Sequence, residues 1–354
     1  MQFVRPTLLI DKQKCLKNLS RMMNKAGKHN LFFRPHFKTH QSLNTAEWFR
    51  EAGVTAITVS SVRMANFFAD HGWQDITIAF PVNLLELDEI NRLAAKVHLN
   101  ILIESKLVIA ALEKSISEKI GIFIEIDTAY HRSGIMSDNF DKIEALIQEI
   151  NPATFLSFKG FLTHGGNTYS ASSEQEVLRI HNNNVQKLNE LRNHFIGKYQ
   201  ELIVSMGDTP SCSISDEFLD IDEIRPGNFI YYDAMQYTIG SCTWDDIAVC
   251  VAAPVVAVYP EREELVVYCG AVHLSKEALK AKHLIYGYPV SLSNSGWQII
   301  HGKNYVKSLS QEHGIIKLEK QNLDQFKVGD LIGILPVHSC LTANLLKDDS
   351  FVLK

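Results

Sequence analysis

Residues 31–70 read LFFRPHFKTH QSLNTAEWFR EAGVTAITVS SVRMANFFAD, and this stretch carries the pattern from which the fold follows. Two short runs rich in β-branched and aromatic residues, 31–34 and 56–60, are each followed by a segment of helical period, 43–52 and 62–70. A short apolar run predicts a buried strand, and apolar residues spaced three and four apart predict an amphipathic helix. The stretch is therefore predicted to hold two consecutive strand–helix units.

The same alternation continues to about residue 235. Eight strand–helix units in roughly 200 residues are typical of a (β/α)8 barrel, so the fold class predicted here is α/β. The six further strands are predicted at 75–79, 99–103, 121–126, 157–163, 202–206 and 221–225, with helices between them at 85–95, 107–115, 141–150 and 174–195.

The pattern of predicted strands and helices changes after residue 240. The segments AVCVAAPVVAVY, ELVVYCGAV, HGIIKLE and DLIGILPVH predict strands, the turn-rich SLSNSG lies among them, and few helices are predicted between them. We therefore predict a barrel domain over residues 1–238 and a C-terminal β domain over residues 239–354.

Composition excludes several classes of protein. The chain has 354 residues, of which 46% are hydrophobic and 21% charged, close to the globular average. The net charge of -5 offers no basic field for nucleic acid or an anionic membrane surface. The longest apolar run, 247–259, contains Pro254 and is shorter than the roughly 20 residues of a membrane span. With no signal-peptide core at the amino terminus and no CxxC pair among six cysteines, we predict a cytoplasmic protein with reduced thiols.

A barrel places its active site on the loops that follow the carboxyl ends of its strands. The loop after the first predicted strand reads RPHFKTHQ and holds Lys38 between His36 and His40. Taken alone, such a lysine is more often an ordinary surface residue. The functional alternative is an amine that burial and neighbouring positive charge keep neutral, so that it acts as a nucleophile or a base.

Other reactive residues follow later strands of the barrel. Small residues after strands 7 and 8 let backbone N–H groups approach an anion, and these two loops are the usual phosphate site of such barrels. Because these two loops lie opposite a lysine in the predicted barrel, they favour a phosphorylated cofactor that forms an imine with that lysine. The candidates are Arg132 after strand 5, His164 and Tyr169 after strand 6, Gly207 and Thr209 after strand 7, and Gly227 after strand 8.

The blocks PTLLID, RPHFKTH, HGGNTY, GDTPS, EIRPGNFIYYD and PVHSCLTANL, in this order, resemble the alanine racemase-like family of pyridoxal 5′-phosphate (PLP) enzymes. Within that family, the chain is most similar to the branch that holds D-serine dehydratases and D-threonine aldolases. The resemblance implies that Lys38 holds PLP covalently and that the protein is a homodimer. It also implies cofactor contacts from the remaining residues, namely Arg132 and Tyr169 near the ring and Gly207, Thr209, Gly227 and Asn228 at the phosphate side.

Two positions depart from the pattern of the family. The segment GAVHLSKE stands where a glycine-rich turn with a lysine is usual, and Val337 stands where asparagine is common. We therefore expect His273, within the first of these segments, to reshape the substrate pocket.

His338 and Cys340 form an HxC pair in PVHSC. On a strand, residues two apart point to the same face, so the imidazole and the thiolate could share one metal ion. From spacing alone, a buried core histidine and cysteine are an equal alternative. The resemblance implies zinc ligands, and a soft thiolate favours Zn²⁺, whereas Mn²⁺ or Mg²⁺ would suit a carboxylate at the second position.

Together these features predict a lyase that acts on a small β-hydroxy D-amino acid. The preferred reaction is dehydration of D-serine or a 3-hydroxy D-amino acid to a keto acid and ammonia, with Lys38 removing the Cα proton. The alternatives are aldolase-type cleavage to glycine and an aldehyde, with His36 or His164 as the base, and amino-acid racemisation. A non-enzymatic PLP carrier is a further alternative, disfavoured by the β domain and the HxC pair.

Overall fold

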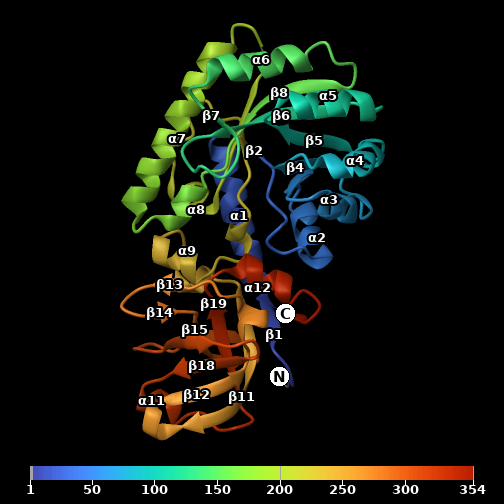
Figure 1. Cartoon of the computed structure of the whole chain (residues 1–354). Helices are drawn as coiled ribbons and strands as arrows, with labels where there is room; N and C mark the ends of the chain where they lie inside the picture. Colours follow the sequence, from blue (N-terminus) through green and yellow to red (C-terminus); the bar gives the residue numbers. More distant parts are fainter. Residues whose placement is uncertain (1–2, 200, 354) are drawn as a thin grey trace. The chain divides into compact units, whose positions relative to one another are not determined.

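The computed structural model describes residues 3–199 and 201–353, and its contacts divide the chain into two compact units. The barrel unit comprises residues 21–38 and 43–227, and the sheet unit comprises residues 3–20, 39–42 and 228–353. Helix α1 (Lys12–Lys28) contributes residues to both units. The elements of each unit are labelled in Figure 1.

The barrel unit is built on eight parallel strands. Strands pair in the order β2-β10-β9-β8-β6-β5-β4-β3, and an isolated parallel bridge between His36 and Thr58 joins the two ends. Every predicted strand is present, which confirms the (β/α)8 barrel. The strands are β2 (Phe32–Phe33), β3 (Ala56–Val59), β4 (Asp75–Pro81), β5 (His98–Ile103), β6 (Ile120–Asp127), β8 (Leu156–Leu162), β9 (Ile203–Met206) and β10 (Glu223–Ile224), with the short β7 (Ile135–Met136) beside β6.

Helices surround these strands in sequence order, as Figure 1 shows for α2 to α7. Three of them begin at a serine, Ser61, Ser105 or Ser173, whose side chain accepts a hydrogen bond from the backbone N–H three residues later. Such a cap satisfies an N–H that has no partner inside the helix. The helices are α2 (Leu43–Glu51), α3 (Val62–Ala69), α4 (Leu87–Ala94), α5 (Lys106–Ser115), α6 (Phe140–Ile150), α7 (Glu174–Phe195) and α8 (Thr209–Ile214).

The sheet unit is organised around the long strand β11 (Val249–Tyr259). This strand pairs with β19 (Leu331–Pro336) and β12 (Glu264–Tyr268), and all of these pairings are antiparallel. The sheet continues on one side through β15 (Gly287–Ser293) and β16 (Gly296–Ile299), and on the other through β18 (His313–Lys317) and β17 (Tyr305–Leu309). The predicted C-terminal β domain is thus present.

The amino terminus belongs to the sheet unit. Strand β1 (Thr7–Asp11) pairs antiparallel with β11 and parallel with β20 (Ser350–Leu353). Ladder hydrogen bonds to both neighbours satisfy its backbone, which explains why these residues group with the sheet rather than with the barrel. The predicted boundary after residue 238 assigned residues 3–20, 39–42 and 228–238 to the barrel domain, whereas their contacts place them in the sheet unit. The division of the sequence into two domains at that boundary stays a prediction.

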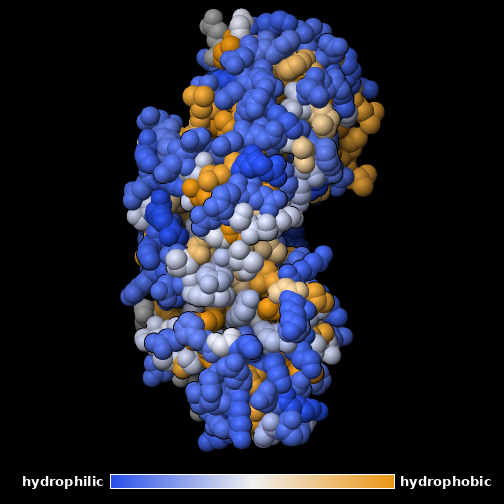
Figure 2. Space-filling view, turned by 90° about the vertical axis from the view of Figure 1, so that its left-hand side faces the viewer, coloured by the Kyte–Doolittle hydropathy of each residue, from blue (hydrophilic) through white to orange (hydrophobic). Residues whose placement is uncertain are grey.

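Apolar side chains are largely withdrawn from the surface. Ile57, Ile76, Leu99, Ile122 and Val204 of the barrel strands are at most 1% exposed, and each such burial contributes roughly 1.5–3 kcal/mol. Figure 2 shows a mainly hydrophilic face on which hydrophobic residues form small separate patches. Among the described residues, no helix has both the length and the apolar character that a membrane crossing requires.

Candidate functional site

The segment after β2 holds Lys38 in a defined position. Phe37 is fully buried, and its ring lies 4.9 Å from that of Phe49 and 5.0 Å from that of Trp73, centroid to centroid. The Phe37 backbone N–H donates to the Thr58 carbonyl at 2.8 Å, and the Lys38 N–H donates to His36 Nδ1 at 3.3 Å. The predicted nucleophile is therefore held at the carboxyl end of the first barrel strand, where a barrel places its chemistry.

Two neutral histidines accompany this lysine. Burial, followed by the positive charge of Lys38, lowers the pKa of His164 to about 3, and the same two causes hold the pKa of His36 well below its usual value. His164 Nδ1 lies 2.8 Å from the Gly207 carbonyl oxygen. Because a carbonyl only accepts, Nδ1 carries the proton and Nε2 is left as an acceptor. The positive charges of Arg132 and Arg225 also lower the pKa of both imidazoles. The predicted residues Lys38, His36, His164 and Arg132 therefore lie near one another, together with Arg225, which was not predicted.

Arg132 lies on the exposed loop after β6. Its guanidinium carbon is 5.4 Å from the centroid of the Tyr130 ring. A carboxylate buried on β6 is expected to pair with Arg132 or another cation. Asp127 Oδ2 lies 2.9 Å from His131 Nδ1, and Asp127 also accepts from three backbone N–H groups of its own loop. Ser133 Oγ donates to Glu125 at 2.9 Å, and the other Glu125 carboxylate oxygen is buried with no hydrogen-bond partner among the described residues.

The loop after β9 brings Thr209 to Tyr169. The Thr209 N–H donates to the Tyr169 hydroxyl at 3.3 Å. Asp208 caps α8 by accepting from the Ser211 N–H at 2.7 Å, and Thr168 Oγ1 donates to the same carboxylate oxygen at 2.8 Å. The residues on either side of Asp208 thus have fixed backbones, as a phosphate-binding loop requires.

Gly207 permits a close approach of two strands. A Cβ at this position would lie 2.6 Å from the Arg225 nitrogen and 2.9 Å from its Cα.

We expect Gly207→Ala to lower the free energy of unfolding by about 1–3 kcal/mol, because the backbones must separate. Denaturant unfolding measures this change, with Gly197→Ala as the control, since no atom lies within 4 Å of a Cβ there. Equal stabilities of the two variants would contradict the steric argument.

The sequence prediction missed Arg225, which precedes Gly227 and is buried inside the barrel. Its Nε donates to Ser205 Oγ at 2.7 Å, and its Nη2 donates to the Thr163 carbonyl. Ser205 Oγ in turn donates to Glu223 at 2.6 Å, and Glu223 accepts from Arg34 Nε at 2.6 Å. Burial, partly offset by Glu223, lowers the pKa of Arg225 to about 10. The available signal was that this arginine begins the RPGN segment (residues 225–228), but the direction of its side chain depends on the strand register.

In the sheet unit, His338 and Cys340 lie together, although not for the predicted reason. Strand β19 ends at Pro336, His338 is the residue before helix α12 (Ser339–Leu345), and Cys340 lies in the first turn of that helix. The strand argument is therefore wrong. Burial disfavours the charged imidazole, but the hydrogen bond and charge of Cys340, with Asp233, outweigh this effect and raise the pKa of His338 to about 9.

The donors around this pair fit a metal with two protein ligands. His338 Nδ1 is buried without a hydrogen-bond partner in the described part of the chain. Cys340 Sγ lies 3.2 Å from Thr39 Oγ1 and 3.5 Å from Asn228 Nδ2. Among the described residues, no group of three or more His, Cys, Asp or Glu side chains is placed to hold a metal. An imidazole and a thiolate suit Zn²⁺, and two ligands leave positions open for water and substrate.

Asn228, predicted as a cofactor contact, belongs to this second group. Its amide nitrogen donates to Asp233 at 2.6 Å and to Ser339 Oγ at 3.0 Å. Its amide oxygen is buried without a partner in the structure as described. Thus Lys38, His36, His164, Arg132, Tyr169, Gly207, Thr209 and Gly227 lie in the barrel unit, and Asn228, His338 and Cys340 lie in the sheet unit.

His40, also in the sheet unit, allows a test of how a buried, neutral imidazole affects the pH dependence of stability. Burial lowers its pKa to about 3, and its Nδ1 accepts from the Ser42 N–H at 3.1 Å. Above pH 6.5 the His40 imidazole is neutral in both the folded and the unfolded protein. Between pH 6.5 and 5, this imidazole gains a proton only in the unfolded protein. The free energy of unfolding should therefore fall by about 2 kcal/mol between pH 6.5 and 5 from this group alone.

We expect His40→Asn, which keeps an acceptor for Ser42, to show a shallower loss of stability over this range. Melting temperatures at pH 7 and pH 5 compare the two proteins. Identical pH dependence of the two proteins would contradict a lowered pKa of His40 in the folded state.

A parallel barrel with a lysine after its first strand, joined to an antiparallel sheet unit that carries an HxC pair, defines an alanine racemase-like enzyme of the lyase type. Residues 10–234 match the family described as alanine racemase, N-terminal domain, and residues 248–351 match the putative serine dehydratase domain. The chain belongs to the alanine racemase N-terminal domain family, and its second part has the serine dehydratase type of domain.

Similar proteins of known activity extend over nearly the whole chain. A D-serine dehydratase of Dictyostelium discoideum is 27% identical, over 97% of this chain and 92% of its own length. A D-threo-3-hydroxyaspartate dehydratase of Delftia sp. strain HT23 is 27% identical, over 95% of this chain and 91% of its own. A D-threonine aldolase of Arthrobacter sp. is 22% identical, over 96% of this chain and 86% of its own. The two dehydratases agree with the assignment of this chain as a carbon–oxygen lyase.

Solved structures agree with the fold. That of the Delftia dehydratase superposes with a TM-score of 0.89 at 24% identity, covering 97% of this chain and 93% of its own. A cysteine-to-alanine variant of the same dehydratase has been solved in a metal-free form, also with a TM-score of 0.89.

Proposed function

We propose that the protein is a PLP- and zinc-dependent dehydratase of β-hydroxy D-amino acids, with D-serine or a 3-hydroxy D-amino acid as substrate. The observation that carries the proposal is the position of Lys38 at the carboxyl end of the first barrel strand, beside two histidines that are neutral at pH 7. The names of the two dehydratase relatives support the substrate class.

Lys38 has two roles in this proposal. Its Nζ would hold PLP in the resting enzyme, and its amine would remove the Cα proton of the substrate. Bound PLP supplies an electron sink for the charge left at Cα. Gly207, Thr209 and Gly227 are the residues that would receive the phosphate, and Tyr169 and Arg132 would lie towards the ring. The fixed backbone at Thr209 supports this assignment.

His338 and Cys340 would hold a zinc ion. A zinc ion held there would supply Lewis-acid chemistry for the departure of the β-hydroxyl, which is otherwise a poor leaving group. The metal-free form of the cysteine variant of the Delftia enzyme supports a metal at the HxC pair. Asn228 and Thr39, which contact Cys340 Sγ, would orient the thiolate.

A second candidate is aldolase-type cleavage, favoured by the similarity to the Arthrobacter aldolase. It requires a base for the β-hydroxyl proton. Burial, followed by the positive charge of Lys38, lowers the pKa of His164 to about 3, so its imidazole is neutral at pH 7 and is a candidate for this base.

Product analysis separates the two reactions. Purified protein is incubated with PLP, zinc and D-serine, D-threonine or D-threo-3-hydroxyaspartate, and the products are assayed. We expect ammonia and a keto acid in equal amounts. Glycine and an aldehyde as main products would reject the dehydratase and support the aldolase, and interconversion of L and D isomers insensitive to EDTA would support a racemase.

We also propose that the protein is a homodimer, as the family resemblance implies. Light scattering coupled to size-exclusion chromatography should give twice the 40.0 kDa mass of the chain. A mass of one chain would contradict the proposal.

A further inference from the structure

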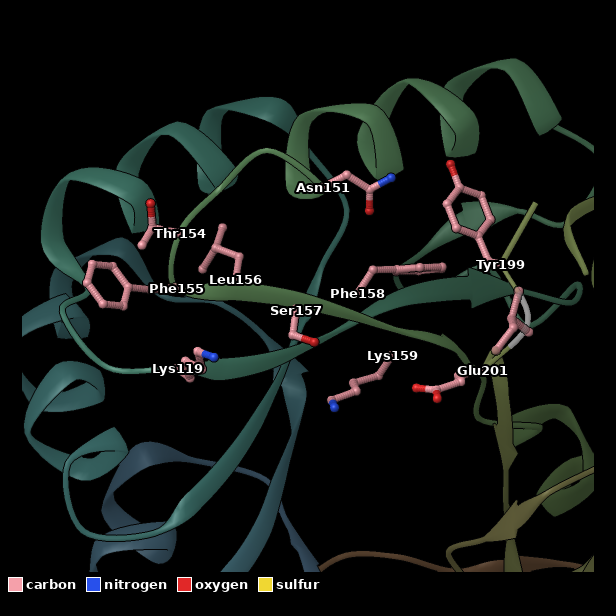
Figure 3. A pocket seen from close by; sticks show the side chains of 11 residues that line it. Lys119, Asn151, Thr154, Phe155, Leu156, Ser157, Phe158, Lys159, Tyr199 and Glu201 are labelled. Atoms are coloured by element: carbon pink, nitrogen blue, oxygen red, sulfur yellow. The ribbon is translucent and has the colours of Figure 1, made fainter.

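A cleft of about 690 Å³ lies at the amino-terminal ends of the barrel strands, around the start of β8 (Figure 3). Its walls come from the beginning of β8, the residue before β6 and the segment before β9. Lys38 follows the carboxyl end of β2, and all eight strands are parallel, so this cleft lies at the end of the barrel away from the lysine. The proposed chemistry does not use it.

A β-bulge sets the direction of one lysine in the cleft. In the pairing of β6 with β8, Ile122 lies opposite Phe158 and Phe123 opposite Gly160, so Lys159 is an extra residue on β8. Gly160 has φ +143°, and a Cβ there would lie 1.9 Å from the Ile203 carbonyl oxygen. Glycine is therefore required at this point, and the bulge is a fixed feature that re-aims the neighbouring side chain.

The opposite strand leaves room for Lys159. A Cβ on Gly121 would lie 3.1 Å from Lys159 Cγ and 1.9 Å from Asn100 Oδ1. The stem of Lys159 thus occupies the space that a side chain at position 121 would fill. Figure 3 shows Ser157, Lys159 and Glu201 on the same side of β8 as Lys119, with Asn151, Leu156 and Tyr199 on the other.

The charged side chains that line the cleft do not neutralise one another. Neither Lys119 nor Lys159 has an ion pair or a hydrogen bond from its side chain to any residue that the structure describes, and the same holds for Glu201. Two ammonium groups face one carboxylate, so the cleft carries an excess positive charge. Ser157 adds a hydroxyl between the lysines, as Figure 3 shows. These groups match the oxygens of an anion with more than one charge.

The rest of the lining is mixed. Asn151 and Thr154 are polar, and Phe158 and Tyr199 pack edge to face with ring centroids 5.6 Å apart. Beside the charged groups, this pair of rings can contact the carbon atoms of an organic ligand.

We propose that this cleft is a second ligand site, which binds a small organic dianion through Lys119 and Lys159. The shared chemistry is a pair of oxyanion charges on a small organic molecule, and it occurs in both phosphate monoesters and dicarboxylates. The site is independent of the reaction assigned to the barrel mouth.

Isothermal titration calorimetry with phenyl phosphate and with succinate tests the proposal on the PLP-loaded protein. We expect one of these probes to bind saturably, and the paired substitution Lys119→Gln and Lys159→Gln to weaken that binding at least tenfold. Raising the salt concentration should weaken it as well, since the contacts are partly exposed. Binding of phenyl phosphate but not succinate would identify a phosphate site, and the reverse a dicarboxylate site.

The controls separate this cleft from the catalytic residues. Lys114→Gln removes an exposed lysine outside the cleft and should leave binding unchanged. Lys119→Gln alone, at an exposed position, serves if the paired variant fails to fold, and should weaken binding at least threefold. Absence of saturable binding for both probes, or equal binding by wild type and the lysine variants, would overturn the proposal. The dehydratase assay does not depend on either result.

Discussion

Lys38→Ala is expected to abolish turnover and the visible absorbance of protein-bound PLP together. The substitution removes both the covalent attachment and the base at Cα, so kcat should fall by at least ~10³-fold. The barrel itself should persist, because Phe37 and the bridge from His36 to Thr58 hold this segment without the lysine side chain. Steady-state kinetics and an absorbance spectrum of the same sample measure both effects.

Two further measurements make the Lys38 result specific. Lys142→Ala, at an exposed position of α6, should leave rate and spectrum unchanged. Borohydride reduction followed by peptide mapping should find PLP on the peptide that contains Lys38. A Lys38→Ala variant with wild-type kcat would remove the central assignment, whatever the fold.

Cys340→Ala carries the second large effect, and it should separate metal from cofactor. Loss of the thiolate leaves His338 as the remaining predicted ligand, so zinc content should fall to a small fraction of one ion per chain. Without Lewis-acid assistance, we expect kcat to decrease by about 10²- to 10³-fold, or roughly 3–4 kcal/mol. PLP occupancy should be nearly unchanged, since Cys340 lies in α12 and not among the predicted cofactor contacts.

The matched control is Cys269→Ala, another buried thiol of the sheet unit, which should keep both its zinc and its rate. Metal analysis by mass spectrometry and kinetics in zinc-buffered solution give the two readouts. Retention of full metal content and full rate in Cys340→Ala would make this thiol structural. Restoration of the rate by Mn²⁺ or Mg²⁺ alone would exclude zinc as the preferred ion.

Much of the barrel follows from local sequence. Its strands are short apolar runs that end at turn residues, and helix α7 spans the predicted 174–195 because Ser173 caps one end and the apolar period continues to the other. Each of these signals depends only on residues that are close together in the sequence. Lys38 was found in the same way, since a reactive side chain after a predicted strand is a local feature.

Contacts between distant parts of the chain were not predictable in this way. Pairing of β1 with β11 joins residues more than 200 positions apart, and nothing in the first ten residues specifies that partner. Arg225 was missed because β10 has only two residues, too few to show which side faces inward. The HxC pair was found for the wrong reason, since its side chains meet at the start of a helix rather than on a strand.

The amino-acid order on its own therefore determined the succession of strands and helices, the lysine at a strand end and the HxC pair, because backbone preference and hydrophobic period act over neighbouring residues. Only the tertiary structure decided which units the termini join, how Glu223 and Ser205 hold Arg225, and that a bulge directs Lys159 into a second cleft. These outcomes depend on register and on steric fit between segments far apart in the chain, and such fit exists only once the backbone has closed on itself.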